Sequence, residues 1–170
     1  MDFFETIEKR YSARGFKDKP VEKEKLDKIL EAARRAPTGV NYQPFKIIVI
    51  DTKKNKELLQ KIYPQPWFVE APIVICIAAS HKDAWTRPWD GKNIADIDAT
   101  IVMDHIILAA TALGLGTCYI GAFKPYAALE LLDYDETLEP ILFTPLGYSD
   151  AEPSERNNVR KDIEELVIYK

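Results

Sequence analysis

The chain has 170 residues, a hydrophobic fraction of 46% and a formal net charge of -4. This length predicts a single domain, residues 1–170, with a substantial hydrophobic core, and the negative balance argues against a general nucleic-acid partner. The N-terminus shows no basic segment followed by an apolar run. The most apolar stretch, Ile101–Leu115, contains Asp104 and His105 and is too short to cross a bilayer. We therefore expect a cytoplasmic protein with no membrane or nucleic-acid partner.

The first segment that suggests chemistry follows a short N-terminal helix. Asp2 and Glu5 have the spacing of a capping box at the start of that helix. Arg10, Ser12 and Arg14 then recur at every second position, so an extended backbone would place all three on one side. Two guanidinium groups and a hydroxyl suit an anion such as phosphate. The alternative is a solvated basic patch at a helix end, which the helix dipole also favours.

A polar loop connects the second predicted helix to the first predicted strand. Residues 22–35 carry apolar side chains at i, i+3, i+4 and i+7, which predicts a helix, and residues 45–50 read as a strand. The loop residues with turn-forming or polar character are Pro37, Thr38, Gly39, Asn41 and Gln43. They indicate either an ordinary connection or a loop that holds a ligand on a rigid turn.

The middle of the chain adds a helix, a buried strand and an aromatic loop. A short amphipathic helix is expected over 53–62, and the unbroken apolar run 71–79 predicts a strand buried on both faces. The polar segment 81–93 contains Trp85 and Trp89. These indoles would either cover a ligand or tuck a loop onto the core.

The longest predicted helix, over 94–113, is apolar nearly all round. Such a helix is buried on more than one side, and in a domain of this size a subunit interface is a natural cover. A strand is expected at 117–120, followed by a turn at 121–123 whose small residues would let a flat ligand approach the backbone.

The last third of the chain predicts a helix over 125–132, a strand over 141–148 and a short terminal strand over 166–169. Cys76 and Cys118 lie in apolar runs and are expected to be buried thiols. The sequence contains no metal-ligand spacing, nucleophile–base pair or dinucleotide fingerprint. If this is an enzyme, we expect a cofactor to carry its chemistry.

Four pieces of the chain, in order, resemble the FMN-dependent nitroreductase family. Arg10–Phe16 is similar to its N-terminal Arg-x-Ser-x-Arg/Lys-x-Phe segment. Ala36–Phe45 is similar to its Ala-Pro-Ser-x-x-Asn-x-Gln-Pro-Trp/Phe loop. Residues 108–123 resemble its central helix and the strand after it, and residues 146–148 with 160–167 resemble its C-terminal end.

The resemblance implies an α+β fold, with a central, mostly antiparallel sheet flanked by helices, and an intertwined homodimer. Two FMN sites would lie at the dimer interface. The long helix would then form the dimer core, and the C-terminal strand would cross to the partner's sheet.

The resemblance also implies where the flavin is held. Arg10, Ser12 and Arg14 would hold its phosphate, ribityl chain and pyrimidine edge, and the polar loop would serve the partner's flavin. A backbone N–H of Gly121 or Ala122 would face the flavin N5. The complete set of implied cofactor residues is Arg10, Tyr11, Ser12, Arg14, Pro37, Thr38, Gly39, Asn41, Gln43, Ile120, Gly121, Ala122 and Arg160.

The implied activity is that of an NAD(P)H oxidoreductase that works by a ping-pong cycle. Hydride would pass through the flavin N5 to an electron-poor acceptor, such as a nitroaromatic or a quinone, so no catalytic side chain is expected. From their placement, Trp67, Trp85 and Trp89 are candidates for a wall beside the substrate. The alternative is an FMN carrier or sensor without turnover.

The chain departs from the family pattern at three positions. Gly39 stands where a second serine is common, and His105 stands where asparagine is frequent. Asn158 stands where many members carry a second cation, and Arg156 is the candidate to replace that cation.

Overall fold

The computed structural model describes residues 1–151 and 159–170. Its strands are β1 (Phe45–Asp51), β2 (Ile73–Ala79), β3 (Gly116–Thr117) and β4 (Glu139–Gly147). They form one sheet in the order β1-β2-β4-β3, and every neighbouring pair is antiparallel. The central strand, β2, is therefore hydrogen-bonded on both edges.

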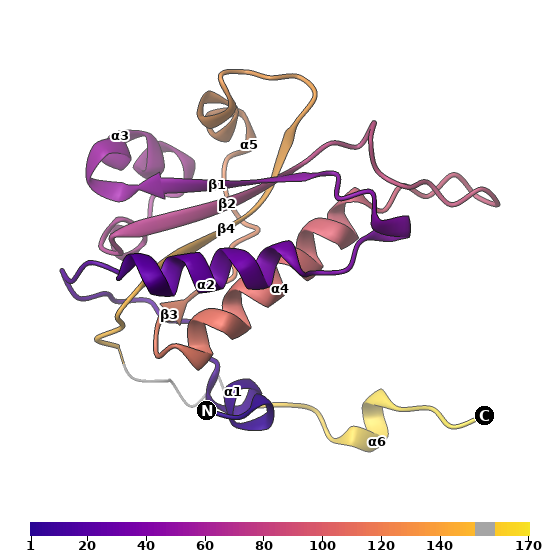
Figure 1. Ribbon diagram of the computed structural model, residues 1–170, viewed down its shortest axis with the longest axis horizontal. Coiled ribbons are helices and arrows are strands. Elements are labelled where there is room, and N and C mark those ends of the chain that lie inside the picture. Colours follow the sequence, from indigo (N-terminus) through magenta and orange to yellow (C-terminus); the bar gives the residue numbers. More distant parts are fainter. Residues whose placement is uncertain (152–158) are drawn as a thin grey trace.

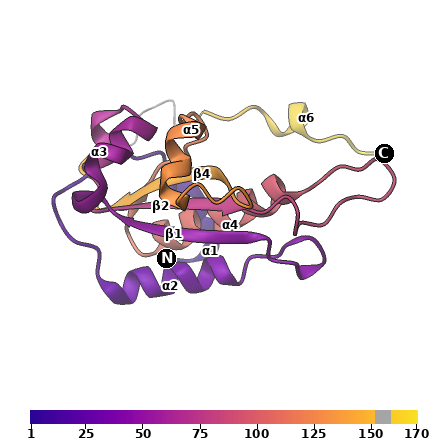
Figure 2. The same cartoon turned by 90° about the horizontal axis from the view of Figure 1, so that it is seen from above.

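Helices cover both faces of this sheet. The α-helices are α1 (Phe3–Lys9), α2 (Lys23–Arg34), α3 (Thr52–Ile62), α4 (Ala95–Ala112), α5 (Pro125–Ala128) and α6 (Ile163–Leu166). Helices α2 and α4 lie on one face, and α3 and α5 lie on the other (Figures 1 and 2). The predicted α+β fold with an antiparallel sheet flanked by helices is confirmed.

The two faces of β2 belong to two different cores. Ile75 and Ile77 pack with α2 and α4, whereas Val74 and Cys76 pack with α3 and α5. The predicted burial of this strand on both faces is confirmed. Cys76 and Cys118 are both buried free thiols, as expected.

Local signals predicted some element ends and missed others. The capping box forms as predicted, because Asp2 Oδ1 accepts from the Glu5 N–H at 2.9 Å and Glu5 Oε2 accepts from the Asp2 N–H at 3.1 Å. The predicted helix 125–132 is split into α5 and a 3-10 turn, η3 (Leu129–Leu132), which ends at the left-handed Asp133.

The prediction of a terminal strand at 166–169 is wrong for the single chain. The backbone instead closes one helical turn, α6, in which the Val167 N–H donates to the Ile163 carbonyl. Residues 167–170 then pair with no strand within residues 1–151 and 159–170. A lone segment cannot form a strand without an edge to pair with, so a crossing to a partner's sheet stays a prediction.

Several large apolar side chains remain on the surface of the single chain. Phe4 on α1 is 80% exposed, and Ile97 on α4 is 44% exposed. The C-terminal tail runs past α1 and away from the sheet (Figure 1), and its Ile168 and Tyr169 are also exposed. Among the described residues, no helix combines the length and hydropathy needed to span a membrane.

Candidate functional site

The Arg10–Arg14 segment runs beside the edge strand β3. Ser12 bridges Thr117, and the Ala13 N–H donates to the Thr117 carbonyl at 2.8 Å. Ala13 is fully buried, which anchors the segment, whereas Arg14 is exposed. The backbone is therefore extended here, and the alternation predicted from sequence follows from that anchor.

Arg10, Ser12 and Arg14 converge on one neighbour, Cys118. Burial raises the pKa of the Cys118 thiol, while Arg14, the Ser12 hydroxyl and Arg10 act in the opposite direction. All three side chains therefore act on this thiol. Within residues 1–151 and 159–170, neither Arg10 nor Arg14 forms a salt bridge with a carboxylate. Their charges are available to an anionic ligand.

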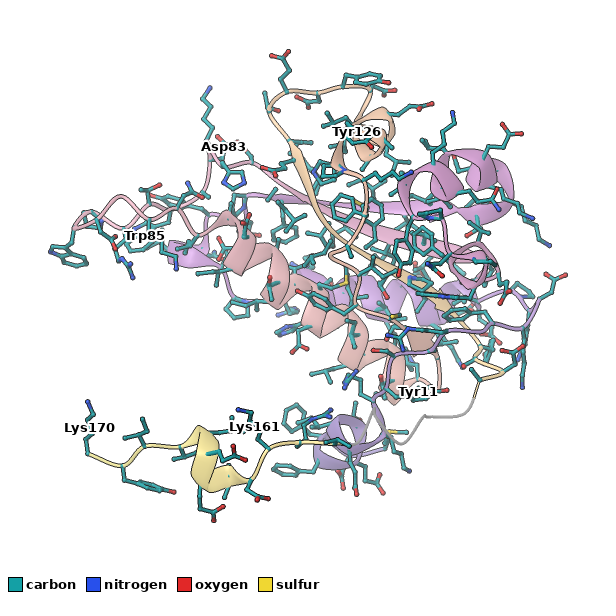
Figure 3. All side chains as sticks on the ribbon, turned by 180° about the vertical axis from the view of Figure 1, so that it is seen from behind. Tyr11, Asp83, Trp85, Tyr126, Lys161 and Lys170 are labelled. Carbon is teal, nitrogen blue, oxygen red and sulfur yellow. The ribbon has the colours of Figure 1, made fainter. Side chains whose placement is uncertain are left out.

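Tyr11 has a different environment from the polar residues beside it. Its hydroxyl donates to the Ala151 carbonyl at 2.7 Å, and its ring packs near Ala13 and Phe16. Figure 3 labels this side chain beside α1. The Tyr11 side chain therefore packs against the protein. A contact between the Tyr11 backbone and the flavin stays a prediction.

The turn after Ile120 offers open backbone close to the same segment. Ile120 exchanges backbone hydrogen bonds with Phe143, at 2.9 and 3.0 Å, which fixes the start of the turn. A Cβ added to Gly121 would meet a single described neighbour, Leu142 Cδ2, at 4.0 Å. Within the described chain, neither the Gly121 nor the Ala122 amide donates a hydrogen bond to protein. These amides remain available to a ligand lying over the turn.

The polar loop between α2 and β1 has an unusual backbone. Val40, Asn41 and Gln43 all have positive φ, at 44°, 60° and 53°. Non-glycine residues in this region cost about 1–3 kcal/mol each, and such strain gathers at ligand clamps and switches. Val40 and Tyr42 are also well exposed, so the loop is not shaped by burial in the core of the single chain.

The polar loop is wedged against the start of α4. A Cβ at Gly39 would lie 2.3 Å from Ile94 Cδ1 and 3.2 Å from Trp85 Cβ, so a side chain at this position would require both neighbours to move. The Gly39 N–H donates to Asp98 Oδ1 at 2.9 Å.

Asp98 is a residue that the sequence reasoning missed. It is 1% exposed, and burial raises the pKa of its carboxyl while the Gly39 amide lowers it. The available signal was the pair of carboxylates, Asp96 and Asp98, in the first turn of an otherwise apolar helix, because an aspartate is rarely fully buried unless it is paired.

The two halves of the predicted flavin site lie at opposite ends of α4. Gly39 contacts its first turn, while Ala13 and Thr117 lie beyond its last turn. The 18 residues of α4 rise about 1.5 Å each, which separates its ends by about 27 Å. Figure 1 also shows the turn after α2 and the segment after α1 near different ends of α4. One chain therefore does not bring Arg10 and Asn41 to one flavin.

The three tryptophans are also divided within one chain. Trp85 lies at the base of a hairpin beside Gly39, and Trp89 at its tip is 85% exposed. Figure 3 shows this hairpin standing away from the body of the chain. Trp67 instead packs against Tyr63 and belongs to the group around Ala13 and Phe16. A shared wall of all three is absent from the described single chain and stays a prediction for an assembly.

Two further predicted positions lie in or near the tail. Arg160 lies in the exposed tail after residue 158, and its Nη1 donates to the Val159 carbonyl. Arg156 and Asn158 lie outside the described residues. His105 Nδ1 lies 2.9 Å from the Ile101 carbonyl, one helical turn earlier.

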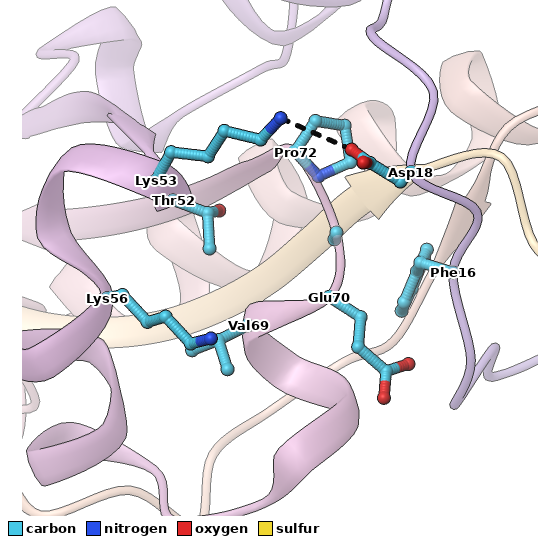
Figure 4. Close-up of a pocket in the computed structure, with 9 residues that line it drawn as sticks. Phe16, Asp18, Thr52, Lys53, Lys56, Val69, Glu70 and Pro72 are labelled. Atoms are coloured by element: carbon cyan, nitrogen blue, oxygen red, sulfur yellow. Dashed lines mark ion pairs between the residues drawn. The ribbon is translucent and has the colours of Figure 1, made fainter.

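One hollow of the single chain lies apart from the predicted flavin residues. A pocket of about 300 Å³ opens between Phe16, Thr52 and Pro72 (Figure 4). Lys53 and Asp18 form an ion pair at its rim, with 3.3 Å between Nζ and Oδ1. None of the predicted cofactor residues lines it, and within the described residues no cluster suited to a metal is present.

Comparison with known proteins gives the family. The model of the nitroreductase family matches residues 7–66 and 61–148. A solved nitroreductase family protein from Clostridium difficile 630 is 41% identical, with a TM-score of 0.91, over 100% of this chain and 99% of that chain. The chain belongs to the nitroreductase family.

Two more similar proteins have names that state a cofactor. An FMN-dependent nitroreductase from Clostridium difficile R20291 is 29% identical, with a TM-score of 0.79 and 96% coverage of both chains. An "FMN reductase (NAD(P)H)" from Bacillus subtilis is 29% identical over 153 residues. The match covers 81% of this chain but 61% of that reductase, so the chain spans less than two thirds of its length.

Proposed function

We propose that this protein is an FMN-dependent NAD(P)H oxidoreductase that passes hydride to an electron-poor acceptor, such as a nitroaromatic or a quinone. The observation that carries the proposal is the presence of two arginines, Arg10 and Arg14, without a salt bridge among the described residues, together with the open amides of Gly121 and Ala122. The names of the similar reductases support the same cofactor and electron donor.

The residues present fit a flavin mononucleotide. Arg10 and Ser12 bind the phosphate and ribityl chain, because guanidinium groups form forked hydrogen bonds with phosphate oxygens. Arg14 places a positive charge at the pyrimidine edge, and the Gly121 or Ala122 N–H lies toward N5. When bound, the flavin supplies the hydride chemistry. The protein contributes position and electrostatics, and needs no acid–base side chain.

The proposed site requires a second copy of the chain. Asn41 and Gln43 lie near the first turn of α4, and the Arg10–Arg14 segment lies beyond its last turn, about 27 Å further along the helix axis, so in this proposal the two residues serve the partner's flavin. The apolar side chains left exposed on α1, α4 and the tail offer the matching interface. A soluble monomer rarely leaves so many large apolar groups in water. We infer a homodimer in which the tail lies on the partner, while the cytoplasmic location stays a prediction from the sequence.

Anaerobic mixing with NADH and with NADPH tests the reductase activity. The purified protein is expected to be yellow. The visible absorbance of its oxidised flavin is expected to bleach with at least one of the two nucleotides. Addition of a quinone or nitroaromatic is then expected to restore the colour. A bound flavin that stays oxidised with both nucleotides would contradict the reductase and favour a carrier or sensor.

The exposed hairpin provides a test of the substrate wall. Trp89→Ala removes an indole that is 85% exposed in the single chain, so the fold is expected to persist. If this indole stacks on the acceptor, the KM for a quinone is expected to rise by about three- to tenfold, as stacking contributes about 1 kcal/mol. Steady-state kinetics with the matched Tyr126→Ala variant as control decides this, and an unchanged acceptor profile would reject the wall.

A further inference from the structure

Asp98 has an environment that stability alone does not explain. Its Oδ1 accepts one hydrogen bond, from the Gly39 N–H, and its Oδ2 has no hydrogen-bond partner among the described residues. Burying a carboxylate with a single hydrogen bond is costly, and apolar replacement of buried charge is often neutral or stabilising. Some other role must favour a carboxylate at this position in the first turn of α4.

The Gly39 contact ties the strained loop to the rest of the fold. The other hydrogen bonds of residues 38–43 are local, such as those from the Asn41 N–H to the Thr38 carbonyl and from the Gln43 N–H to Thr38 Oγ1, and the Phe45 N–H at the start of β1 donates to the Gln43 carbonyl. Within the described chain, the hydrogen bond to Asp98 is the one that links residues 38–43 to an element distant in the sequence. This hydrogen bond is made by Gly39, the residue directly before Val40, where the run of positive φ angles begins.

Left-handed backbone at Val40, Asn41 and Gln43 needs such a fixed point. These conformations persist only where the surroundings over-determine them. The close packing of Gly39 on Ile94 fixes the position of the loop, and the Asp98 hydrogen bond fixes the direction of its amide.

We propose that Asp98 is the positioning residue of this loop, and that it holds the Gly39 amide so that Asn41 and Gln43 are preorganised to meet the partner's flavin. The role of the carboxylate in ordering residues 38–43 stands on the geometry of the single chain. The benefit to flavin binding rests on the proposed function.

Three variants test this role in the full-length protein. Asp98→Leu removes the acceptor together with the unpaired oxygen, and Asp98→Asn retains an acceptor without the charge. Asp96→Asn is the matched control, because Asp96 is exposed one half-turn away and faces His81, at 3.4 Å between Oδ1 and Nε2. Each variant is compared with the wild type by hydrogen exchange without flavin, by FMN titration and by urea unfolding.

Asp98→Leu is expected to speed amide exchange in residues 38–43 and to raise the Kd for FMN, each by about tenfold or more, because a hydrogen bond to a charged group contributes about 1.5–3 kcal/mol. Asp98→Asn retains an acceptor, so it is expected to change the amide exchange rate and the Kd for FMN by only about threefold relative to the wild type. The urea midpoint is expected to stay unchanged or to rise. A purely structural role predicts instead a lower midpoint with unaltered exchange in the loop.

The readouts separate the two levels of the proposal. Exchange in the flavin-free protein reports on the loop alone, so it decides the role of Asp98 even if the wild type binds no FMN, a result that would reject the proposed function. Wild-type exchange rates and wild-type FMN affinity in both Asp98 variants would overturn the inference while leaving the proposed function intact.

Discussion

A heterodimer that pairs an Arg10→Ala chain with an Asn41→Val chain is expected to bind one FMN with wild-type affinity. Arg10 and Asn41 of one chain lie at opposite ends of α4 and, in the proposed site, serve different flavins. Both substitutions therefore fall in one site, and the other site keeps both native residues. The damaged site is expected to lose at least tenfold in affinity, because it lacks a charge-assisted phosphate contact worth about 1.5–3 kcal/mol.

The reciprocal heterodimer supplies the control. Here one chain carries Arg10→Ala and Asn41→Val together, and its partner is wild type. Each site then contains one substitution, so no site of wild-type affinity is expected. Differently tagged chains, purified in sequence and titrated by flavin fluorescence, give both stoichiometries. If Arg10 and Asn41 of one chain met the same flavin, the outcomes of the two heterodimers would be exchanged.

The fold on which this proposed division rests was predictable only in part from the sequence. The unbroken apolar run of β2 predicts a strand covered on both faces, and the apolar girth of α4 predicts burial on more than one side. Both signals are local, because each apolar residue of the strand or helix indicates burial at its own position. The alternation of Arg10, Ser12 and Arg14 similarly follows from an extended backbone.

The conformation of the polar loop was not predictable from its residues. Val40 is β-branched, and left-handed φ is a genuine outlier for such a side chain. Its cause is a set of contacts distant in the sequence, since Gly39 packs on Ile94 and bonds to Asp98, 59 positions further along the chain. Sequence patterns within a short window carry no information about that partner.

The prediction of a strand at residues 166–169 was wrong for a related reason. Residues 166–169 have the apolar, β-branched composition of a strand, yet strand formation depends on an edge that composition cannot supply. In the single chain, the local hydrogen bond between Val167 and Ile163 closes a helical turn instead. The β-propensity of these residues thus indicated an apolar segment that needs a partner strand. It did not predict the structure that the segment takes in the single chain.

Phe4→Asp is expected to abolish the dimer and, with it, flavin binding. Phe4 is 80% exposed in the single chain, so the charge does not disturb the protomer core. Burial of a phenylalanine contributes about 1.5–3 kcal/mol, and a two-fold interface contains the residue twice. Removing both contacts weakens the dimer by about 3–6 kcal/mol, or at least a hundredfold in Kd.

Flavin binding is expected to fall with the dimer because each site takes Arg10 from one chain and Asn41 from the other. Sedimentation velocity and flavin absorbance, followed over the same dilution series, are expected to change together, while circular dichroism stays native. Tyr126→Asp is the matched control, since Tyr126 is 73% exposed and lies with α5 on the opposite face of the sheet (Figure 3). A Phe4→Asp protein that sediments as a yellow dimer would show that α1 lies outside the interface. A colourless dimer would instead separate flavin binding from assembly, and the shared site would then have to be abandoned.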